Sequence, residues 1–517
     1  SSEAPARAAS SLFMWQEKRV AKEELVKPRY REHDVSAVAD AVLADLGLTT
    51  QICNRFYASL YHKEQQQAQQ QAQRPPPPAP APPSEVPSPA PRTQSNQEPL
   101  SHLRDLRSRW ELRLCAAVAK ATEKAVMPLM RTRPYPQLEP ANMRAPWLYE
   151  VDDLIGLVAA TPHPNHSGSD GAGTQGWSLL NLQLNVPSYA ELQQRYSDLS
   201  PQERQSGLDD EMRGWFSEER HHIGLRVLAS GAVPVLLQFA RTGVPLGLRG
   251  QVWMAALQLA PTERDYIDFA RLQREVLRVQ LSTDLALRRD VHNPIHSEPF
   301  FIFADLVEGT LLAFSRDASV LRRTAHVVGL PHVAARGKSG QAYVFPPSGV
   351  VPMRGLSLFA YPLCYLYSNP HELYLTMREL WVRYWCKLHS VSSRPGTLLP
   401  LLHLFQALVL EHSPQLCAHL QRLGLQPVRL AAPWIAFAFA GYLPPEQTLL
   451  LWDRVLGFDS LEPLPILAAA ILLFHEKALL HAADTDDARH VLLDSAELKV
   501  APLLQAFLSD PQQLRDL

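Results

Sequence analysis

The chain has 517 residues, of which 46% are hydrophobic and 20% are charged. That length and composition suit a globular protein of two or three domains with a sizeable core. The formal net charge of −2 gives no global reason to expect a nucleic acid or an anionic membrane as partner.

The spacing of the cysteines and the hydropathy of the chain indicate in which cellular compartment the protein is expected. Five cysteines are scattered without CxxC spacing, which favours a reducing environment over a disulfide framework. The apolar run Pro463 to Phe474 is shorter than the roughly 20 residues a bilayer requires. The first residues carry no long apolar core of the kind a signal peptide needs. We therefore expect a cytoplasmic protein without a transmembrane segment.

The first hundred residues divide by composition. Residues 1–63 contain weakly amphipathic segments, such as Val35 to Leu46, and are expected to form a helical region. Residues 64–97 are rich in Gln and Pro, cannot bury a core, and are predicted to be a disordered linker. A second interpretation of the Pro-rich part, as a ligand for aromatic grooves of partner domains, is less favoured.

Residues 98–239 are predicted to be a second helical N-terminal region with loops. Apolar residues at helical spacing indicate one amphipathic helix from Leu106 to about Met127. The Gly- and Ser-rich stretch Thr161 to Gly176 is interpreted as a surface loop, because its glycines lack the Lys-Ser/Thr of a phosphate-binding loop. Short helices are expected within Val186 to Tyr196 and from Ser200 to about Ser206. From Glu219 onward, apolar residues recur at helical spacing almost without interruption.

A specific pattern follows, consisting of Gly243, Pro245, Arg249 and Trp253. Gly and Pro restrict the backbone of a turn in complementary ways. Arg249 and Trp253 are four residues apart, so in a helix they share one face. The pattern predicts a helix start that a buried Trp and a long cation fix to a neighbouring element.

The second half of the chain is almost entirely helical by pattern, and only Ala342 to Phe345 is a weak strand candidate. We therefore predict an all-α domain over residues 240–500, followed by a C-terminal tail over 501–517. The predicted runs are Trp253–Leu259, Tyr266–Val279, Phe303–Phe314, Leu356–Tyr367, Pro370–His389, Leu398–Glu411, Ser413–Leu423, Pro433–Ala440, Pro445–Leu456 and Leu461–Ala483.

Three stretches together carry a family resemblance. The Gly-Val-Pro…Arg…Trp pattern, the segment Leu449 to Leu456 with Trp452 and Asp453, and Gly355 to Tyr367 occur in the order and spacing typical of the TBC domain. The chain therefore resembles the all-helical TBC domain family of Rab GTPase-activating proteins. That resemblance implies a TBC-type fold and a GTP-bound Rab GTPase as partner.

The resemblance also implies two catalytic positions. TBC domains supply an Arg from an Ile-x-x-Asp-x-x-Arg helix and a Gln from a Tyr-x-Gln-Gly loop. In this chain Asp290 matches the Asp, but Asn293 stands at the Arg position; in the second motif Arg354 stands at the Gln position, before Gly355. Asn lacks the charge and fork of a guanidinium, and Arg cannot accept a hydrogen bond from water as Gln does. These differences predict impaired catalysis by the usual pair of residues.

Alternative cations lie close in sequence. Arg354 could itself reach a phosphate from the second loop, although an ordinary surface ion pair is the favoured interpretation. Arg288 and Arg289 precede Asn293 on the same helix, and for Arg289 a solvated helix surface is favoured.

Other candidate sites are weaker. His292 and His296 have the spacing of metal ligands, but Pro294 lies between them and no third ligand is near. The aromatic stretch Trp381 to Trp385 is expected to be helix core. We predict no metal and no cofactor.

The sequence therefore predicts a regulator and not an enzyme with its own small-molecule substrate. The first hypothesis is a GTPase-activating protein for a Rab, recruited peripherally to endomembranes through that Rab. The alternative is a catalytically impaired TBC domain that serves as a Rab-binding adaptor or scaffold.

Overall fold

The structure is a computed structural model, and it describes residues 184–208, 214–293, 302–328, 346–493, 495 and 498–515, together with the short pieces 107–110, 130–132, 151, 153, 334–336 and 342–344. All of them lie in the second of the two units into which the chain divides, Gln94–Leu517. The predicted regions 1–63 and 64–97, the predicted loop at 161–176 and most of the predicted helix 106–127 lie outside the described residues.

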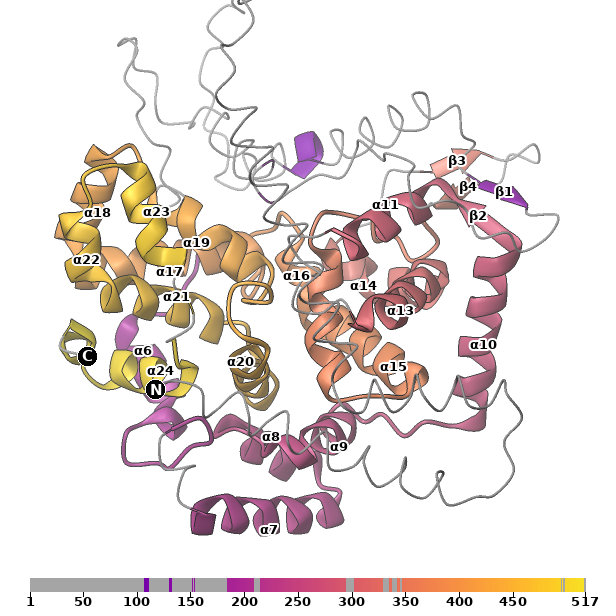
Figure 1. Cartoon of the computed structure of the whole chain (residues 1–517), viewed down its shortest axis with the longest axis horizontal. Coiled ribbons are helices and arrows are strands. Elements are labelled where there is room, and N and C mark those ends of the chain that lie inside the picture. Colours follow the sequence, from indigo (N-terminus) through magenta and orange to yellow (C-terminus); the bar gives the residue numbers. More distant parts are fainter. Residues whose placement is uncertain are drawn as a thin grey trace, which may run out of the picture. The chain divides into compact units, whose positions relative to one another are not determined.

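Helices make up nearly all of the described structure (Figure 1). The first part contains α6 (Tyr189–Arg195), α7 (Gly214–Ser230), α8 (Val233–Arg241), α9 (Leu246–Ala256), α10 (Glu263–Arg278), α11 (Ser282–Val291), α13 (Ala304–Arg316) and α14 (Ala318–Val328). The second part contains α15 (Pro370–Leu380), α16 (Cys386–Leu388), α17 (Leu398–His412), α18 (Pro414–Arg422), α19 (Pro427–Ala436), α20 (Pro445–Gly457), α21 (Pro463–Phe474), α22 (Glu476–His481), α23 (Thr485–Leu493) and α24 (Val500–Ser509).

Short 3₁₀ segments and two strand pairs complete the fold. The 3₁₀ segments are η2 (Ser197–Leu199), η5 (Leu356–Phe359), η6 (Tyr361–Tyr365) and η8 (Pro511–Arg515), and one π-helical turn, η7 (Trp381–Trp385), lies between α15 and α16. Strand β1 (Met130–Thr132) pairs antiparallel with β2 (Val279–Leu281), and β3 (Ala334–Arg336) with β4 (Ala342–Val344). Within the described residues no sheet exceeds two strands, so the prediction of an all-α domain is confirmed.

The apolar helix α21 forms the centre of the C-terminal half. Every residue from Pro463 to Leu473 is buried, because α17, α19, α20 and α24 all pack against it. Helix α24 begins at the predicted domain boundary and runs into the predicted tail, with Leu504 and Phe507 almost fully buried. No helix in the described ranges combines the length and the apolar character needed to cross a bilayer.

An aromatic cluster joins the two halves of the domain. Trp385 lies 4.9 Å from Trp452 and 5.5 Å from Phe359, measured between ring centroids. Trp381 is 3% exposed and Trp385 fully buried, which confirms the prediction that this stretch is core.

Several predicted elements were wrong in detail. Residues 200–206 form turns instead of a helix, because Gln205 and Ser206 supply oxygen acceptors to the buried Arg454. The predicted helix from Leu356 to Tyr367 is two 3₁₀ segments, η5 and η6. Helix α19 begins at Pro427, ahead of the predicted start at Pro433, and helices α14, α23 and α24 were not predicted.

Candidate functional site

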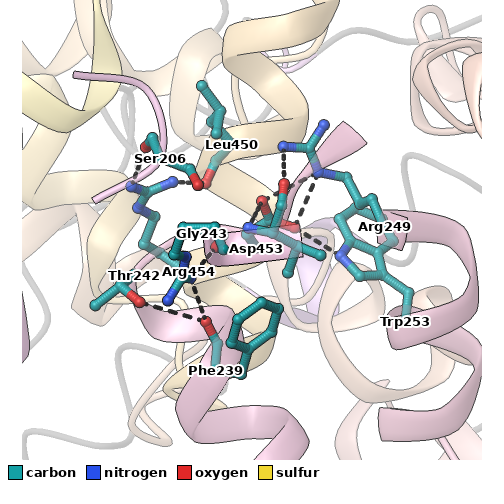
Figure 2. Close-up of polar contacts among 11 residues, drawn as sticks. Ser206, Phe239, Thr242, Gly243, Arg249, Trp253, Leu450, Asp453 and Arg454 are labelled. Carbon is teal, nitrogen blue, oxygen red and sulfur yellow. Dashed lines mark hydrogen bonds and ion pairs between the residues drawn. The ribbon is translucent and has the colours of Figure 1, made fainter. Parts of the chain in front are cut away.

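The carboxylate of Asp453 on α20 ties the start of α9 to the core (Figure 2). It accepts hydrogen bonds from the Arg249 Nε at 3.1 Å, the Trp253 indole at 2.7 Å and the Val244 backbone N–H at 3.0 Å. Arg249 closes the arrangement by donating to the Val244 carbonyl at 2.8 Å. Pro245 immediately precedes the first residue of α9 and stands at its N-cap.

This ion pair is fully withdrawn from water. Asp453 is 0% exposed and Arg249 is 2% exposed. Burial raises the pKa of Asp453 above the usual range for an aspartate, and the guanidinium of Arg249 opposes that shift. A buried pair of this kind is sustained by complete hydrogen bonding, and removing one partner leaves a charge stranded in the core.

A second buried cation lies beside the first pair. Arg454 is 0% exposed and donates to the Leu450 carbonyl at 2.8 Å and the Ser206 carbonyl at 2.9 Å. Gly243 is pressed against it with φ +88°; a Cβ there would lie 2.8 Å from the Ser206 Cβ and 3.0 Å from an Arg454 nitrogen. Only glycine fits both the backbone angle and the space. The sequence analysis did not single out Arg454. The two adjacent charged residues Asp453 and Arg454, within the otherwise apolar sequence of α20, could have indicated a buried cation there.

Trp452 and Trp253 are both buried, at 1% and 0% exposure, as predicted. Their ring centroids lie 6.4 Å apart. The Trp452 indole donates to the Ala438 carbonyl at 2.9 Å, so the polar edge of each Trp has an acceptor. One packed unit formed by side chains of α9 and α20 therefore contains both tryptophans together with Arg249 and Asp453.

The residues at the two predicted catalytic positions lie on segments joined by Asp290. This aspartate is 0% exposed near the end of α11, and its carboxylate accepts the backbone N–H groups of Gly355 at 2.5 Å and Ser357 at 2.7 Å. Asn293 follows α11 by two residues, and its N–H donates to the Asp290 carbonyl at 3.2 Å. Arg354 immediately precedes Gly355 in the turn that the carboxylate holds.

The turn after Arg354 has a demanding geometry. Gly355 has φ +91°, and a Cβ there would lie 2.8 Å from the Phe437 ring. Tyr361 at the start of η6 donates its hydroxyl to the Val291 carbonyl at 2.7 Å, which connects η6 to α11 as Asp290 connects the start of η5 to α11. The end of α11 is therefore held against η5 and η6 by Asp290, Gly355, Ser357 and Tyr361.

Asp290 lies in an unusual electrostatic environment. Burial raises the pKa of this carboxyl to about 6, although the Gly355 and Ser357 N–H groups and the charge of Arg354 act in the opposite direction. Because the side chain is inaccessible to solvent, it positions the backbone and cannot act as a general base on a bound ligand.

The alternative cations near Asn293 are placed differently. Arg288 donates to Glu308 of α13 at 3.0 Å, and His292 is bonded to the other oxygen of the same carboxylate at 2.9 Å. The hydrogen bond to Glu308 raises the pKa of His292. Arg289 is exposed on the helix surface. Arg288 is thus paired with α13, whereas the charge of Arg354 acts on Asp290.

Among the described residues, no group of three or more His, Cys, Asp or Glu side chains is arranged so that it could hold a metal ion. His296, the second member of the weak metal pair, lies outside the described residues. What the junction offers chemically is a guanidinium from Arg354 and a carboxamide from Asn293. Both are groups that can donate to an anionic ligand.

Comparisons with known proteins agree with these motifs. A family model of the Rab-GTPase-TBC domain matches residues 352–480. TBC1 domain family member 19 of Homo sapiens is 34% identical over 436 residues, which cover 80% of this chain and 82% of the human protein. A TBC domain-containing protein kinase-like protein of Dictyostelium discoideum is 32% identical over 89 residues, or 17% of this chain and 9% of that protein. A solved structure, the Chlamydomonas flagellar RabGAP TBC domain, is 19% identical with a TM-score of 0.42, covering 64% of this chain and 99% of its own.

Proposed function

This chain belongs to the TBC domain family, and on that premise we propose that it binds a GTP-bound Rab GTPase and acts on it as a GTPase-activating protein of low activity. The contact is formed by the junction where the end of α11, with Asn293, meets the turn that carries Arg354. The observation that carries the proposal is the pair of hydrogen bonds from Gly355 and Ser357 to Asp290, which fixes this junction.

The physical argument concerns charge. A GTPase hydrolyses GTP slowly when its own site poorly stabilises the negative charge that develops on the phosphates, and a partner's arginine can supply about 10³ to 10⁵ in rate. Here the backbone that would present such a group is held in place, but the side chain at position 293 is neutral. The fixed backbone of the junction supports binding of a Rab, whereas the neutral side chain of Asn293 supports only a weak acceleration of GTP hydrolysis.

The second candidate is a Rab-binding adaptor or scaffold without activity. It is favoured by the same two side chains, because Asn293 brings no charge and Arg354 has donors only and cannot accept a hydrogen bond from the attacking water. Both candidates place the protein in the cytoplasm and on endomembranes through its Rab, and both predict binding. They differ in whether hydrolysis accelerates.

Two measurements on a panel of Rabs separate these outcomes. Binding is measured with each Rab loaded with a non-hydrolysable GTP analogue or with GDP, and hydrolysis is measured as a single turnover with GTP. The proposal expects one or a few Rabs to bind in the GTP state and to hydrolyse GTP faster than alone, by less than a full arginine provides. Binding without acceleration supports the adaptor, and absence of binding across the panel overturns both.

Asp290→Asn is the matched probe for the junction. The substitution keeps the shape of the side chain but replaces one acceptor oxygen with a donor, so one of the two N–H groups loses its partner. We expect Rab binding to weaken. A control, Asp486→Asn, alters an aspartate that is 81% exposed on α23 and should leave binding unchanged. Equal binding by both variants would show that the Rab contacts another face.

A further inference from the structure

The turn between α19 and α20 has a backbone conformation that its residue types disfavour. Ala438 and Phe439 both lie in the left-handed region, with φ of +47° and +64°, and Gly441 follows with φ of +80°. Alanine and phenylalanine rarely adopt this region, and residues that do so persist only where their surroundings fix them. The segment from Phe437 to Gly441, named here the 437–441 turn, is therefore a strained element of the C-terminal half.

Contacts with the core fix this strained backbone. The Ala438 carbonyl accepts the indole N–H of Trp452 at 2.9 Å, and both Ala438 and Phe439 are 0% exposed. The Phe439 N–H donates to the Trp434 carbonyl at 2.7 Å at the end of α19. The buried cluster around Trp452 therefore sets the direction in which Phe437 leaves the end of α19.

Phe437 is the residue of this turn that reaches the junction. Its ring occupies the space next to Gly355, where two ring carbons would lie 2.8 Å and 2.9 Å from an added Cβ. The ring centroid of Phe437 also lies 6.0 Å from that of Phe359 in η5 and 5.9 Å from that of His389. Because position 355 is a glycine, an aromatic ring from the C-terminal half contacts the backbone that directly follows Arg354.

A second contact joins the same two segments. Gly441 lies against Leu358 of η5, and a Cβ at Gly441 would lie 3.0 Å from both methyl carbons of that leucine. Both ends of the 437–441 turn thus contact the segment that begins at Gly355. The backbone of that segment is also bound by Asp290, which accepts the N–H groups of Gly355 and Ser357. Hydrogen bonds from α11 and packing from the 437–441 turn therefore act on the same few residues.

We propose that Phe437 is a positioning residue for the turn that carries Arg354: packed against Gly355, it holds the backbone from which Arg354 extends and keeps the Gly355 N–H directed at Asp290. The side chain of Phe437 has no group that can donate to an anionic ligand, so it acts through the turn and is not a catalytic residue. Its effect on GTP hydrolysis rests on the proposed function, whereas its effect on the conformation of the turn does not.

Amide hydrogen exchange of the full chain tests the conformation of the turn without any partner. The amides of residues 355–360 exchange only when this segment opens. We expect Phe437→Ala to raise their exchange rate by about tenfold or more, because the ring that packs on Gly355 is removed. Phe437→Leu keeps apolar bulk at the position and should raise the rate less. The amides of α21 should keep their wild-type rate, since they report opening of the core.

Phe458→Ala is the matched control. Phe458 lies at the C-cap of α20 as Phe437 lies at the C-cap of α19, and both side chains are half-buried. The Phe458 ring packs against Tyr196, with 4.7 Å between the ring centroids, and not against Gly355. Its removal should leave the exchange of residues 355–360 within about twofold of the wild type. Circular dichroism verifies that each variant keeps the helical fold.

Single-turnover hydrolysis with a Rab that the wild type accelerates gives the second measurement. Phe437→Ala should lower the acceleration at saturating protein by about fivefold or more, because Arg354 is then presented from a backbone that is no longer fixed. The protein concentration that gives half of the maximal rate should change less than the rate does. A purely structural role would move neither quantity in a variant that stays folded, and Phe437→Leu should recover part of the rate.

Two exchange results would overturn the proposal. One is exchange of residues 355–360 in Phe437→Ala within twofold of the wild type. The other is an increase of equal size in Phe458→Ala or throughout α21, which would indicate a general loss of stability. Where Phe437→Ala fails to fold, Phe437→Leu gives the same comparison.

The two measurements fail separately. Faster exchange confined to residues 355–360 supports the positioning role even when no Rab of the panel binds, and in that case the proposed function alone is overturned. Unchanged single-turnover kinetics in a Phe437→Ala variant with faster exchange would overturn the claim that the conformation of this turn controls hydrolysis.

Discussion

The carboxylate of Asp453 accepts the indole N–H of Trp253 at 2.7 Å, although 200 residues of sequence separate them. The same carboxylate accepts the Nε of Arg249 and the backbone N–H of Val244. The Gly-Val-Pro…Arg…Trp pattern and the Leu-Trp-Asp helix, which are far apart in the sequence, are therefore two halves of one buried structure. Its stability depends on every member having its partner.

Asp453→Ala should be among the most damaging single substitutions in the chain. It strands the guanidinium of Arg249 in the core and leaves the Trp253 indole and the Val244 N–H without their acceptor. Breaking a buried pair by removing one partner typically costs about 3 to 5 kcal/mol. We expect the free energy of unfolding, measured in urea, to fall by that amount or the protein to fail to fold.

A double variant at the same ion pair tests whether the stranded charge, and not the lost side-chain volume, causes the destabilisation. Arg249→Met with Asp453→Leu removes both charges together and should be less destabilising than Asp453→Ala alone, because no charge is left unpaired. Asp486→Ala, on an exposed aspartate of α23, is the control and should change stability by no more than about 0.5 kcal/mol. A loss for Asp453→Ala as small as that of the control would contradict the role assigned to this carboxylate.

Trp452→Ala tests the aromatic cluster independently of charge. The side chain is 1% exposed and packs against Trp385 and Trp253, so its removal leaves a large cavity. Truncations of buried Trp cost about 3 to 5 kcal/mol. Trp215→Ala is the matched control, because that side chain is 47% exposed on α7. Thermal melts should show a marked fall for Trp452→Ala alone; similar melts for the two variants would argue against the placement of Trp452.

Local patterns predicted most helices, and the misses have physical causes. Periodicity and capping residues identified α10, α17 and α20 to within a few residues, and the single helix predicted from Pro370 to His389 is divided into α15, the π-helical turn η7 and α16. The segment after Gly355 is apolar at helical spacing, but Pro362 near the start of η6 has no N–H to donate to the preceding turn, and the structure has two 3₁₀ segments there. Helix α14 contains three valines and one threonine among its 11 residues, which have modest helix propensity, and the burial of Val320 and Thr324 supports its formation.

The sequence predicted which residues belong to the site, but it did not predict the hydrogen bonds that join them. Spacing indicated that Arg249 and Trp253 share a helix face, yet nothing local indicates that Asp453 is their common acceptor. Likewise, Asp290 was singled out through the family motif, whereas its bonds to Gly355 and Ser357 span more than 60 residues of sequence. Contacts of this range are decided by tertiary packing, which single-sequence patterns do not contain.

Stability should depend on pH through Asp290. Burial raises the pKa of this carboxyl from the ordinary 3.8 to about 6 in the folded chain, so the folded state binds more protons between these values. The free energy of unfolding therefore falls as pH rises through this window, and stability contributed by the protonated form is lost above about pH 6. Relative to Asp290→Asn, the wild type should lose roughly 3 kcal/mol from pH 3.5 to pH 7, at about 1.4 kcal/mol per pH unit.

The comparison with Asp290→Asn isolates this one group, because all other titrations are shared by the two proteins. Urea unfolding at a series of pH values gives the difference directly. The measurement needs no second titrating variant, because the substitution removes only the Asp290 carboxyl. A flat difference between Asp290→Asn and the wild type from pH 4 to pH 7 would show that folding does not raise the pKa of Asp290.

The last prediction concerns catalysis and takes as its premise one Rab shown to bind. Asn293→Arg restores a guanidinium at the first position, and Arg354→Gln restores an amide that can both donate to and accept from water at the second. Since electrostatic stabilisation of this kind is worth several kcal/mol in a site closed to water, the double variant should hydrolyse GTP faster than the wild type by about 10² or more. Asn293→Arg alone should gain less, because Arg354 still occupies the second position. Single-turnover rates at one fixed protein concentration give the comparison.

Arg354→Ala distinguishes this assignment from a rescue by the chain's own arginine. If Arg354 supplies the residual charge stabilisation, its truncation should abolish the weak activity of the wild type while binding in the GTP state is retained. Arg289→Ala, which removes an exposed arginine from the adjacent helix surface, is the control and should leave the rate unchanged. A wild type that already accelerates hydrolysis on the scale of a full arginine, and keeps that rate in Arg354→Ala, would show that another residue supplies the charge and that positions 293 and 354 are wrongly assigned.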